Sequence, residues 1–336
     1  MKRCLIIGGT GPTGYCIVER LLRRGDAVTI FHTGAHERDF SGDVEHLHGD
    51  PREAADLSRL LSSRSFDLAV STSGRIRHIV PALRGRVGKL VSISGLPYYK
   101  NSHIKPGEIG IPLPIRESDP AEHDPLNTHG NYVVRGEETV MDAHRRGDFD
   151  ATILRYTMVY GKYTYVPFEW FLVRRILDGR RVMALEADGL MVPQRGYAEN
   201  LAEAVLLSLD LPASSGQAYN VGDEQCLSLR ALAALIAEAL DHDWELVEVP
   251  LRLSPCRNPF AMRQNTLFDL SKIRRDLGYR DVVPAREATM AFVRWLRDNP
   301  ILRGGPEEGK LGPSAFDYAA EDRMIEKCRQ AFGDIA

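Results

Sequence analysis

The sequence predicts an α/β protein built on a doubly wound parallel sheet, and three observations support this. Short runs rich in Val, Ile and Leu recur through the first half of the chain. Amphipathic stretches such as EETVMDAHRR lie between these runs, so the order reads strand, helix, strand, helix. A glycine-rich turn at residues 8–14 directly follows the first apolar run. A sheet of this kind binds its ligand at the carboxyl ends of its strands.

The elements of the first half follow in that order. The apolar run 4–7 is the expected first strand, and Ile17, Val18, Leu21 and Leu22 then share one face of a helix. The further strands are expected at residues 27–31, 44–50, 67–73, 89–94 and 151–156. These elements make residues 1–160 the expected first domain, which holds the sheet.

The second half changes character and predicts a smaller α/β lobe. Helices are expected at residues 170–179, 199–210, 227–240 and 269–280, and a final amphipathic helix is expected to run through Trp295. Ser228 and Ser271 are the expected N-caps, and a strand is expected at residues 217–223. The arginines at 174 and 175 are expected to be solvated. Residues 161–300 therefore form mainly this lobe, with some segments returning to the first domain. A C-terminal tail, 301–336, follows a Gly/Pro-rich linker and ends in a helix at 316–332 that packs back on the body or on a partner.

Composition and charge narrow the function classes. The chain of 336 residues has a formal net charge of -3, which disfavours nucleic acid as the main partner. No apolar run is long enough to span a bilayer, so we expect no membrane partner and a cytoplasmic protein. Five cysteines without CxxC spacing indicate neither a disulfide framework nor a zinc site, and we expect no metal among the site residues.

The turn at Gly8, Gly11 and Gly14 has the properties that a pyrophosphate needs. It allows a tight turn, a bare backbone that phosphates can approach, and close packing of the following helix on the sheet. The helix N-terminus adds amide donors and the positive end of its dipole. The turn therefore predicts a dinucleotide site; the alternative is a purely structural turn.

Four further segments extend the pattern. They are ILRYTMVYG (153–161), RGYAENLAEAV (195–205), AYNVGDEQCLSL (218–229) and DLSKIRRDLGY (269–279). With the glycine turn, they make residues 2–300 resemble the extended short-chain dehydrogenase/reductase superfamily, which includes epimerases and dehydratases. The resemblance implies a Rossmann-type fold with a smaller C-terminal substrate lobe, and a small-molecule substrate. A homodimer is compatible with it.

The resemblance also implies a set of cofactor contacts. Asp50 matches the acid that binds the adenine, although it could instead cap the turn before Pro51, and residues 71–73 would lie over the diphosphate and ribose. The full set is Gly8, Thr10, Gly11, Pro12, Thr13, Gly14, His32, Thr33, Arg38, Asp50, Pro51, Ser71, Thr72, Ser73, Tyr156 and Val159.

The cofactor is expected to be NADP, with NAD as the open alternative. The acid that would bind a ribose 2′-OH is missing after the second strand, where the sequence reads FHTGAHERD. Thr33, His36 and Arg38 could receive a 2′-phosphate instead. The alternative is that Arg38 is an ordinary solvated charge.

The reaction centre departs from the family pattern. Ser94 fits the family's strand-end serine, four residues before Tyr98. Family members commonly read P-x-x-x-Tyr-Gly-x-x-Lys-x-x-x-Glu, whereas this chain reads PLNTHGNYVVRGE, with His129 at the tyrosine position and Val133 at the lysine position. A second frame makes Tyr132 the catalytic tyrosine and puts Gly136 at the lysine position.

Losing both residues together has a chemical logic. A tyrosine side chain ordinarily titrates near ~10 and needs a nearby cation to ionise at neutral pH, whereas a histidine titrates near ~6.5 unaided. His129 or Tyr132 is therefore expected to transfer the proton while Ser94 polarises the substrate oxygen; the rival interpretation is a decayed centre. The proline-rich segment 97–131 is expected to cover the substrate. Arg75, Arg155 and Arg195 are expected to bind the substrate if it is an anion.

These features predict an NAD(P)-dependent oxidoreductase acting on a carbonyl or alcohol. The alternatives are an epimerase or dehydratase that retains its cofactor, and a dinucleotide sensor without turnover. An RNA-binding relative of the superfamily is disfavoured by the acidic balance of charge.

Overall fold

The computed structural model describes residues 1–100, 102, 110–252, 254, 256, 258–260, 262 and 264–333. The chain divides into two compact units. The first comprises residues 1–159, 196–224 and 268–282, and the second comprises 160–195, 225–267 and 283–336. The segment 97–131, expected to cover the substrate, lies partly outside the described residues.

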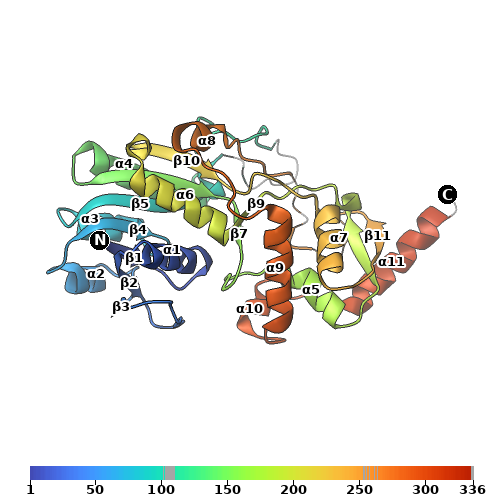
Figure 1. Ribbon diagram of the computed structural model, residues 1–336. Coiled ribbons are helices and arrows are strands. Elements are labelled where there is room, and N and C mark those ends of the chain that lie inside the picture. Colours follow the sequence, from blue (N-terminus) through green and yellow to red (C-terminus); the bar gives the residue numbers. More distant parts are fainter. Residues whose placement is uncertain are drawn as a thin grey trace. The chain divides into compact units, whose positions relative to one another are not determined.

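A seven-stranded parallel sheet forms the centre of the first unit (Figure 1). Its strands are β1 (Arg3–Ile7), β2 (Ala27–His32), β3 (Val44–His48), β4 (Phe66–Ser71), β5 (Val87–Gly95), β6 (Asp150–Tyr156) and β10 (Gln217–Val221). The strand order is β10-β6-β5-β4-β1-β2-β3, so the sheet reverses its direction of winding between β1 and β4. The doubly wound parallel sheet predicted from the sequence is confirmed.

Helices cover both faces of this sheet because the strands alternate their apolar side chains between the two faces. Cys4 and Ile6 of β1 pack in one core cluster with α1 (Pro12–Arg23), α6 (Ala198–Asp210) and α8 (Ser271–Leu277). Leu5 and Ile7 pack in another with α2 (Ala54–Leu61), α3 (Ile76–Leu83) and α4 (Thr128–Arg145). An inner strand such as β1 is therefore buried on both sides, as its near-continuous apolar run predicts, whereas the edge strand β3 is only partly buried.

The second unit contains α5 (Trp170–Leu177), β8 (Val182–Glu186), α7 (Leu229–Ala239), β11 (Glu245–Val249), α9 (Ala285–Asp298), α10 (Pro306–Gly309) and α11 (Tyr318–Gly333). The short strands β7 (Met158–Tyr160) and β9 (Arg195–Tyr197) lie where the chain passes between the units. Strands β8 and β11 pair in parallel. Ser228 caps α7 by accepting a hydrogen bond from the Ala231 amide, as predicted.

The other predicted cap is wrong. Ser271 is the first residue of α8, and its amide donates to the Asp269 carboxylate at 2.9 Å. The aspartate two residues earlier therefore supplies the acceptor that the serine was expected to provide.

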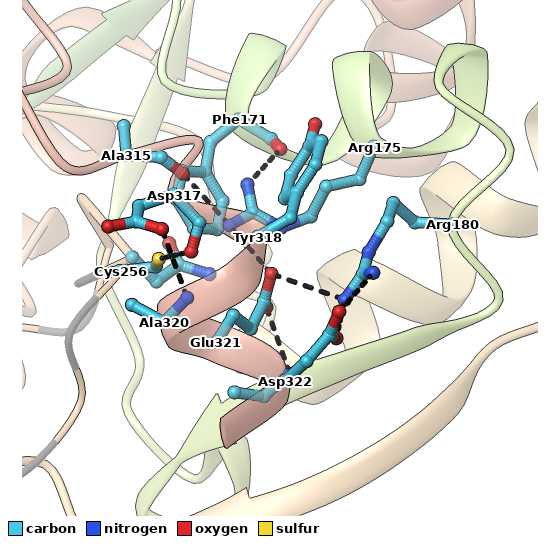
Figure 2. A network of polar contacts seen from close by, with 12 residues as sticks. Phe171, Arg175, Arg180, Cys256, Ala315, Asp317, Tyr318, Ala320, Glu321 and Asp322 are labelled. Carbon is cyan, nitrogen blue, oxygen red and sulfur yellow. Dashed lines mark hydrogen bonds and ion pairs between the residues drawn. The ribbon is translucent and has the colours of Figure 1, made fainter. Parts of the chain in front are cut away.

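Within the second unit, the C-terminal helix α11 contacts α5 through a buried arginine, Arg175 (Figure 2). Arg175 is fully buried, donates to the carbonyls of Phe171 and Ala315 at 2.9 Å each, and reaches Glu321 of α11 at 3.3 Å. Glu321 also accepts the Ala184 amide of β8 at 3.1 Å. The expectation that Arg175 is a solvated helix-surface residue is wrong, because the tail supplies the acceptors that bury its charge.

Candidate active site

The glycine turn lies between β1 and the N-terminus of α1. A Cβ on Gly14 would lie 2.8 Å from the backbone N and Cα of Gly9, so only glycine lets the helix pack this closely on the turn. Gly11 is the N-cap of α1, in extended conformation, and a Cβ there would meet nothing within 4 Å. Pro12 occupies the first turn of the helix, where a missing amide hydrogen costs nothing. The turn thus offers a bare backbone and open space beside a helix N-terminus, which fits a diphosphate group.

The end of β4 lies beside this turn. Ile7 and Ser71 pair across β1 and β4, and both the amide and the hydroxyl of Thr72 donate to the Ile7 carbonyl, at 2.9 and 3.0 Å. The Ser71 hydroxyl donates to the Ser73 carbonyl at 3.3 Å, and Ser73 itself is exposed. The structure therefore brings the predicted residues 71–73 to the switch point of the sheet, where doubly wound folds bind their ligands.

The end of β2 and the loop that follows it carry three more of the predicted residues. His32 is only 5% exposed, and burial lowers its pKa below the usual value, whereas Thr33 is exposed. Arg38 donates from Nε to the Thr10 carbonyl at 3.3 Å. The guanidinium is thus held against the glycine turn.

Asp50 and Pro51 lie beyond β3. The Asp50 carboxylate accepts the Arg52 amide at 2.8 Å and pairs with the Arg52 guanidinium, and these hydrogen bonds lower the pKa of Asp50. The Pro51 carbonyl accepts the Arg75 amide at 3.3 Å. Asp50 does cap its own turn, and its expected contact with adenine stays a prediction.

A cavity of about 680 Å³ opens at the carboxyl ends of β4 and β5. The start of α3 and one face of α4 complete its lining, and Ser94, His129 and Tyr132 all contribute to it. Both His129 and Tyr132 are exposed side chains of α4, and Val133 lines the same cavity. The three predicted catalytic residues therefore converge on one space.

Ser94 is held by a buried ion pair. Its hydroxyl donates to Glu137 of α4 at 2.5 Å, and Glu137 receives the Arg155 guanidinium through contacts of 2.7 to 3.2 Å. Arg155 also donates to the Tyr99 hydroxyl at 2.9 Å and lies 3.4 Å from the centre of the Tyr98 ring. Burial alone would lower the pKa of Arg155, but the Glu137 carboxylate holds it above its usual value.

Sequence reasoning gave no role to Glu137, although its match to the family's helix pattern was a usable signal. It also expected Arg75, Arg155 and Arg195 to meet an anionic substrate. Arg75 lines the cavity, but Arg155 is buried against Glu137, and Arg195 is buried against Glu169 at 2.8 Å. The expectation was wrong for the two buried arginines, because each already neutralises a carboxylate.

Two predicted cofactor residues lie at or beyond the end of β6. Tyr156 is 5% exposed, packs in the core, and donates from its hydroxyl to the Leu201 carbonyl at 3.4 Å. Val159 is partly buried against the same core. A cofactor contact of Tyr156 would have to come from its backbone, and both assignments stay predictions.

A glycine turn at the switch point of a doubly wound parallel sheet defines a Rossmann-type dinucleotide-binding fold. Residues 89–222 match the family profile described as the NAD dependent epimerase/dehydratase family. Solved structures share the fold, and the profile match lies within the residues 2–300 that resemble extended short-chain dehydrogenase/reductases. Among the described helices, none is long and apolar enough to cross a membrane.

Two solved structures illustrate the fold similarity. A UDP-glucose 4-epimerase from Thermotoga maritima, solved with UDP-glucose, superimposes with a TM-score of 0.72 at 17% identity, covering 88% of this chain and 99% of that one. A dTDP-glucose 4,6-dehydratase from Streptomyces venezuelae, solved with NAD and a second ligand, gives 0.68 at 24% identity, covering 88% and 97%.

Two curated relatives match this chain over only part of their own length. The chloroplast stem-loop binding protein of 41 kDa b from Arabidopsis thaliana is 27% identical over 254 residues, or 71% of this chain and 63% of the relative. A dTDP-glucose 4,6-dehydratase from Streptomyces antibioticus is 25% identical over 244 residues, or 70% and 65%. The matched regions span less than two thirds of either relative.

Proposed function

We propose that this chain is an NAD(P)-dependent oxidoreductase of the extended short-chain dehydrogenase/reductase type, acting on a small-molecule carbonyl or alcohol. The observation that carries the proposal is the convergence of Ser94, His129 and Tyr132 on one cavity at the carboxyl ends of β4 and β5. When bound, the nicotinamide supplies or accepts the hydride. The glycine turn and residues 71–73 would hold the dinucleotide.

The hydrogen bonding of Ser94 defines its role. A hydroxyl has one proton, and Ser94 directs it to Glu137 at 2.5 Å, so its oxygen is left as an acceptor. In this orientation Ser94 does not donate to a substrate oxygen, and the single hydroxyl proton of an alcohol substrate stays available for transfer to α4. With a carbonyl substrate, the Ser94 hydroxyl would have to rotate away from Glu137 to donate.

The proposed proton-transfer group lies on α4. Val133 lines the cavity where the family pattern has lysine, so no cation at that position activates a tyrosine. A histidine can exchange a proton near neutral pH without such a partner. His129 is therefore the proposed proton-transfer group, and Tyr132, one helical turn further on, is the alternative.

The cavity lining suggests an anionic substrate. Arg75, Arg77 and Arg135 all line it and are exposed, so their charges face solvent and any ligand. The structures with the same fold include a UDP-glucose 4-epimerase and a dTDP-glucose 4,6-dehydratase, so nucleotide-linked sugars are the first substrates to test. Binding of such an anion should weaken with salt.

The proposed cofactor is NADP(H), although the Streptomyces venezuelae dehydratase structure contains NAD. Arg38, held against the Thr10 carbonyl, is the group proposed to meet a 2′-phosphate. Calorimetry should show tighter binding of NADP(H) than of NAD(H). Arg38→Ala should reduce this difference in affinity. Arg23→Ala is the control, because Arg23 is exposed at the end of α1, and it should leave the difference unchanged. Equal or tighter NAD(H) binding by the wild type would refute the preference.

The activity test uses UDP-glucose and dTDP-glucose with each nicotinamide cofactor, followed by cofactor absorbance and product chromatography. His129→Phe should lose ~10²–10⁴-fold in turnover with little change in cofactor affinity. His144→Phe, at the other end of α4 and outside the cavity lining, is the control. A larger loss in Tyr132→Phe would move the role to Tyr132, and full activity in the double variant would remove α4 from the chemistry.

The same assay separates the alternatives. An epimerase or dehydratase would convert the sugar with no net change in the nicotinamide, and a sensor would bind the dinucleotide without turnover. The similarity to a stem-loop binding protein adds a third outcome. Salt-sensitive retention of a stem-loop RNA, in the absence of any turnover, would favour that function.

A further inference from the structure

Three histidines and a glutamate meet at the edge of the sheet, outside the cavity described above. His32 is the last residue of β2, His46 and His48 belong to β3, and Glu37 lies in the loop between the two strands. His46 and His48 are two residues apart, so they point to the same face of the strand. His48 pairs in register with His32. The strand pairing thus brings all three imidazoles together.

The side chains present one potential ligand atom each to a common centre. All four atoms lie within 4.8 Å of one another. His46 Nδ1 lies 3.1 Å from His32 Nε2 and 3.1 Å from Glu37 Oε2, while His48 Nε2 lies 3.0 Å from Glu37 Oε1. Tetrahedral zinc with bonds of about 2.0–2.1 Å separates its nitrogen and oxygen ligands by roughly 3.3 Å.

We propose that His32, Glu37, His46 and His48 bind one divalent transition-metal ion, with Zn²⁺ as the best match. Imidazole and carboxylate ligands in a four-coordinate arrangement suit Zn²⁺, whereas Mg²⁺ and Ca²⁺ require mostly oxygen ligands. Three neutral imidazoles and one carboxylate leave the occupied site with a single positive charge. The site does not depend on the proposed activity.

The surroundings leave a path for the ion while fixing the ligands. His32 is 5% exposed, and Glu37 and His48 side chains are 52% and 56% exposed, so the ion enters from the solvent side. Gly34 has a φ of +78°, a conformation that favours glycine, and this turn brings the loop back so that Glu37 reaches the histidines. At the other end of the loop, Phe40 stacks on Tyr15 with ring centroids 5.4 Å apart.

Metal binding changes one hydrogen bond. The Gly34 amide donates to His32 Nδ1 at 3.3 Å, so the ring proton of neutral His32 is on Nε2. Binding through Nε2 moves this proton to Nδ1, and the Gly34 contact is then lost. The loop between β2 and β3 must therefore adjust locally at Gly34 when the ion binds.

The test is a titration of tag-free, chelator-stripped full-length protein with Zn²⁺ by calorimetry. Co²⁺ serves as a spectroscopic probe, because its visible absorption distinguishes four-coordinate from six-coordinate sites. One ion per chain is expected, with the intense visible bands of tetrahedral Co²⁺. Mg²⁺ should not compete.

Variants assign the ligands. His46→Ala and His48→Ala should each weaken Zn²⁺ binding by at least ~100-fold, since loss of outer hydrogen bonds alone costs ~10–100-fold. His36→Ala is the matched control, because His36 is exposed in the same loop and lies outside the cluster. Should a histidine variant fail to fold, Glu37→Gln at the exposed ligand tests the same site. No binding by the wild type, or undiminished binding by the ligand variants, would overturn the proposal.

Discussion

Replacing Gly11 with valine tests whether the turn after β1 holds a dinucleotide. Gly11 has φ -80° and ψ 178°, a conformation that valine adopts readily, and a Cβ there meets nothing within 4 Å. The expected cost in folding free energy is about 1 kcal/mol or less, from placing a poor N-cap residue at the start of α1. The new methyl groups fill the open space that a diphosphate must enter. NADPH affinity should fall by at least ~100-fold, or about 2.8 kcal/mol.

Gly14→Ala is the structural counterpart. Its Cβ would lie 2.8 Å from the Gly9 backbone, so α1 must shift on the turn. Overpacking of this kind costs roughly 1–3 kcal/mol, and urea unfolding should show this loss for Gly14→Ala but not for Gly11→Val. Calorimetry with NADPH then measures binding in the folded Gly11→Val protein. Wild-type affinity in that variant would refute the dinucleotide assignment.

Two further predictions concern stability. Arg155→Met leaves the Glu137 carboxylate buried without its cation and should lower the free energy of unfolding by about 3–5 kcal/mol, whereas adding Glu137→Gln should recover part of the loss. Urea unfolding of both variants measures this, and additive losses would contradict the coupling. Burial, reinforced by Asp223, raises the pKa of Asp281 to about 7, well above the ~3.9 of an unfolded chain. The protonated Asp281 therefore stabilises the fold fully below about pH 4, and this contribution is lost as the pH rises to about 7. The free energy of unfolding of Asp281→Asn, relative to that of the wild type, should therefore increase between about pH 4 and pH 7; a constant difference would refute the shift.

Local sequence determined many of the elements and the glycine turn. Spacing of apolar residues located the strands of the first unit and its helices α1 and α4, because burial on both faces of a parallel sheet requires continuous apolar strands. The glycine at 14 could be interpreted without the fold, since a Cβ there would meet the nearby Gly9 backbone, whereas a Cβ on Gly8 would meet the Thr72 side chain beyond β4. The cap at Ser228 was equally local, but at α8 two candidate acceptors lay two residues apart, and sequence alone chose the wrong one.

Tertiary structure decided which distant groups meet. The expectation that Arg155 would face a substrate failed because its partners, Glu137 and Tyr99, come from α4 and from the segment after β5. Sequence reasoning weighed metal binding only through the spacing of cysteines, whereas His32 and His46 are 14 residues apart and become neighbours only through the pairing of β2 with β3. Local patterns fix backbone conformation, whereas charge pairing and ligand convergence depend on strand order and register, which the chain acquires only when its core is buried.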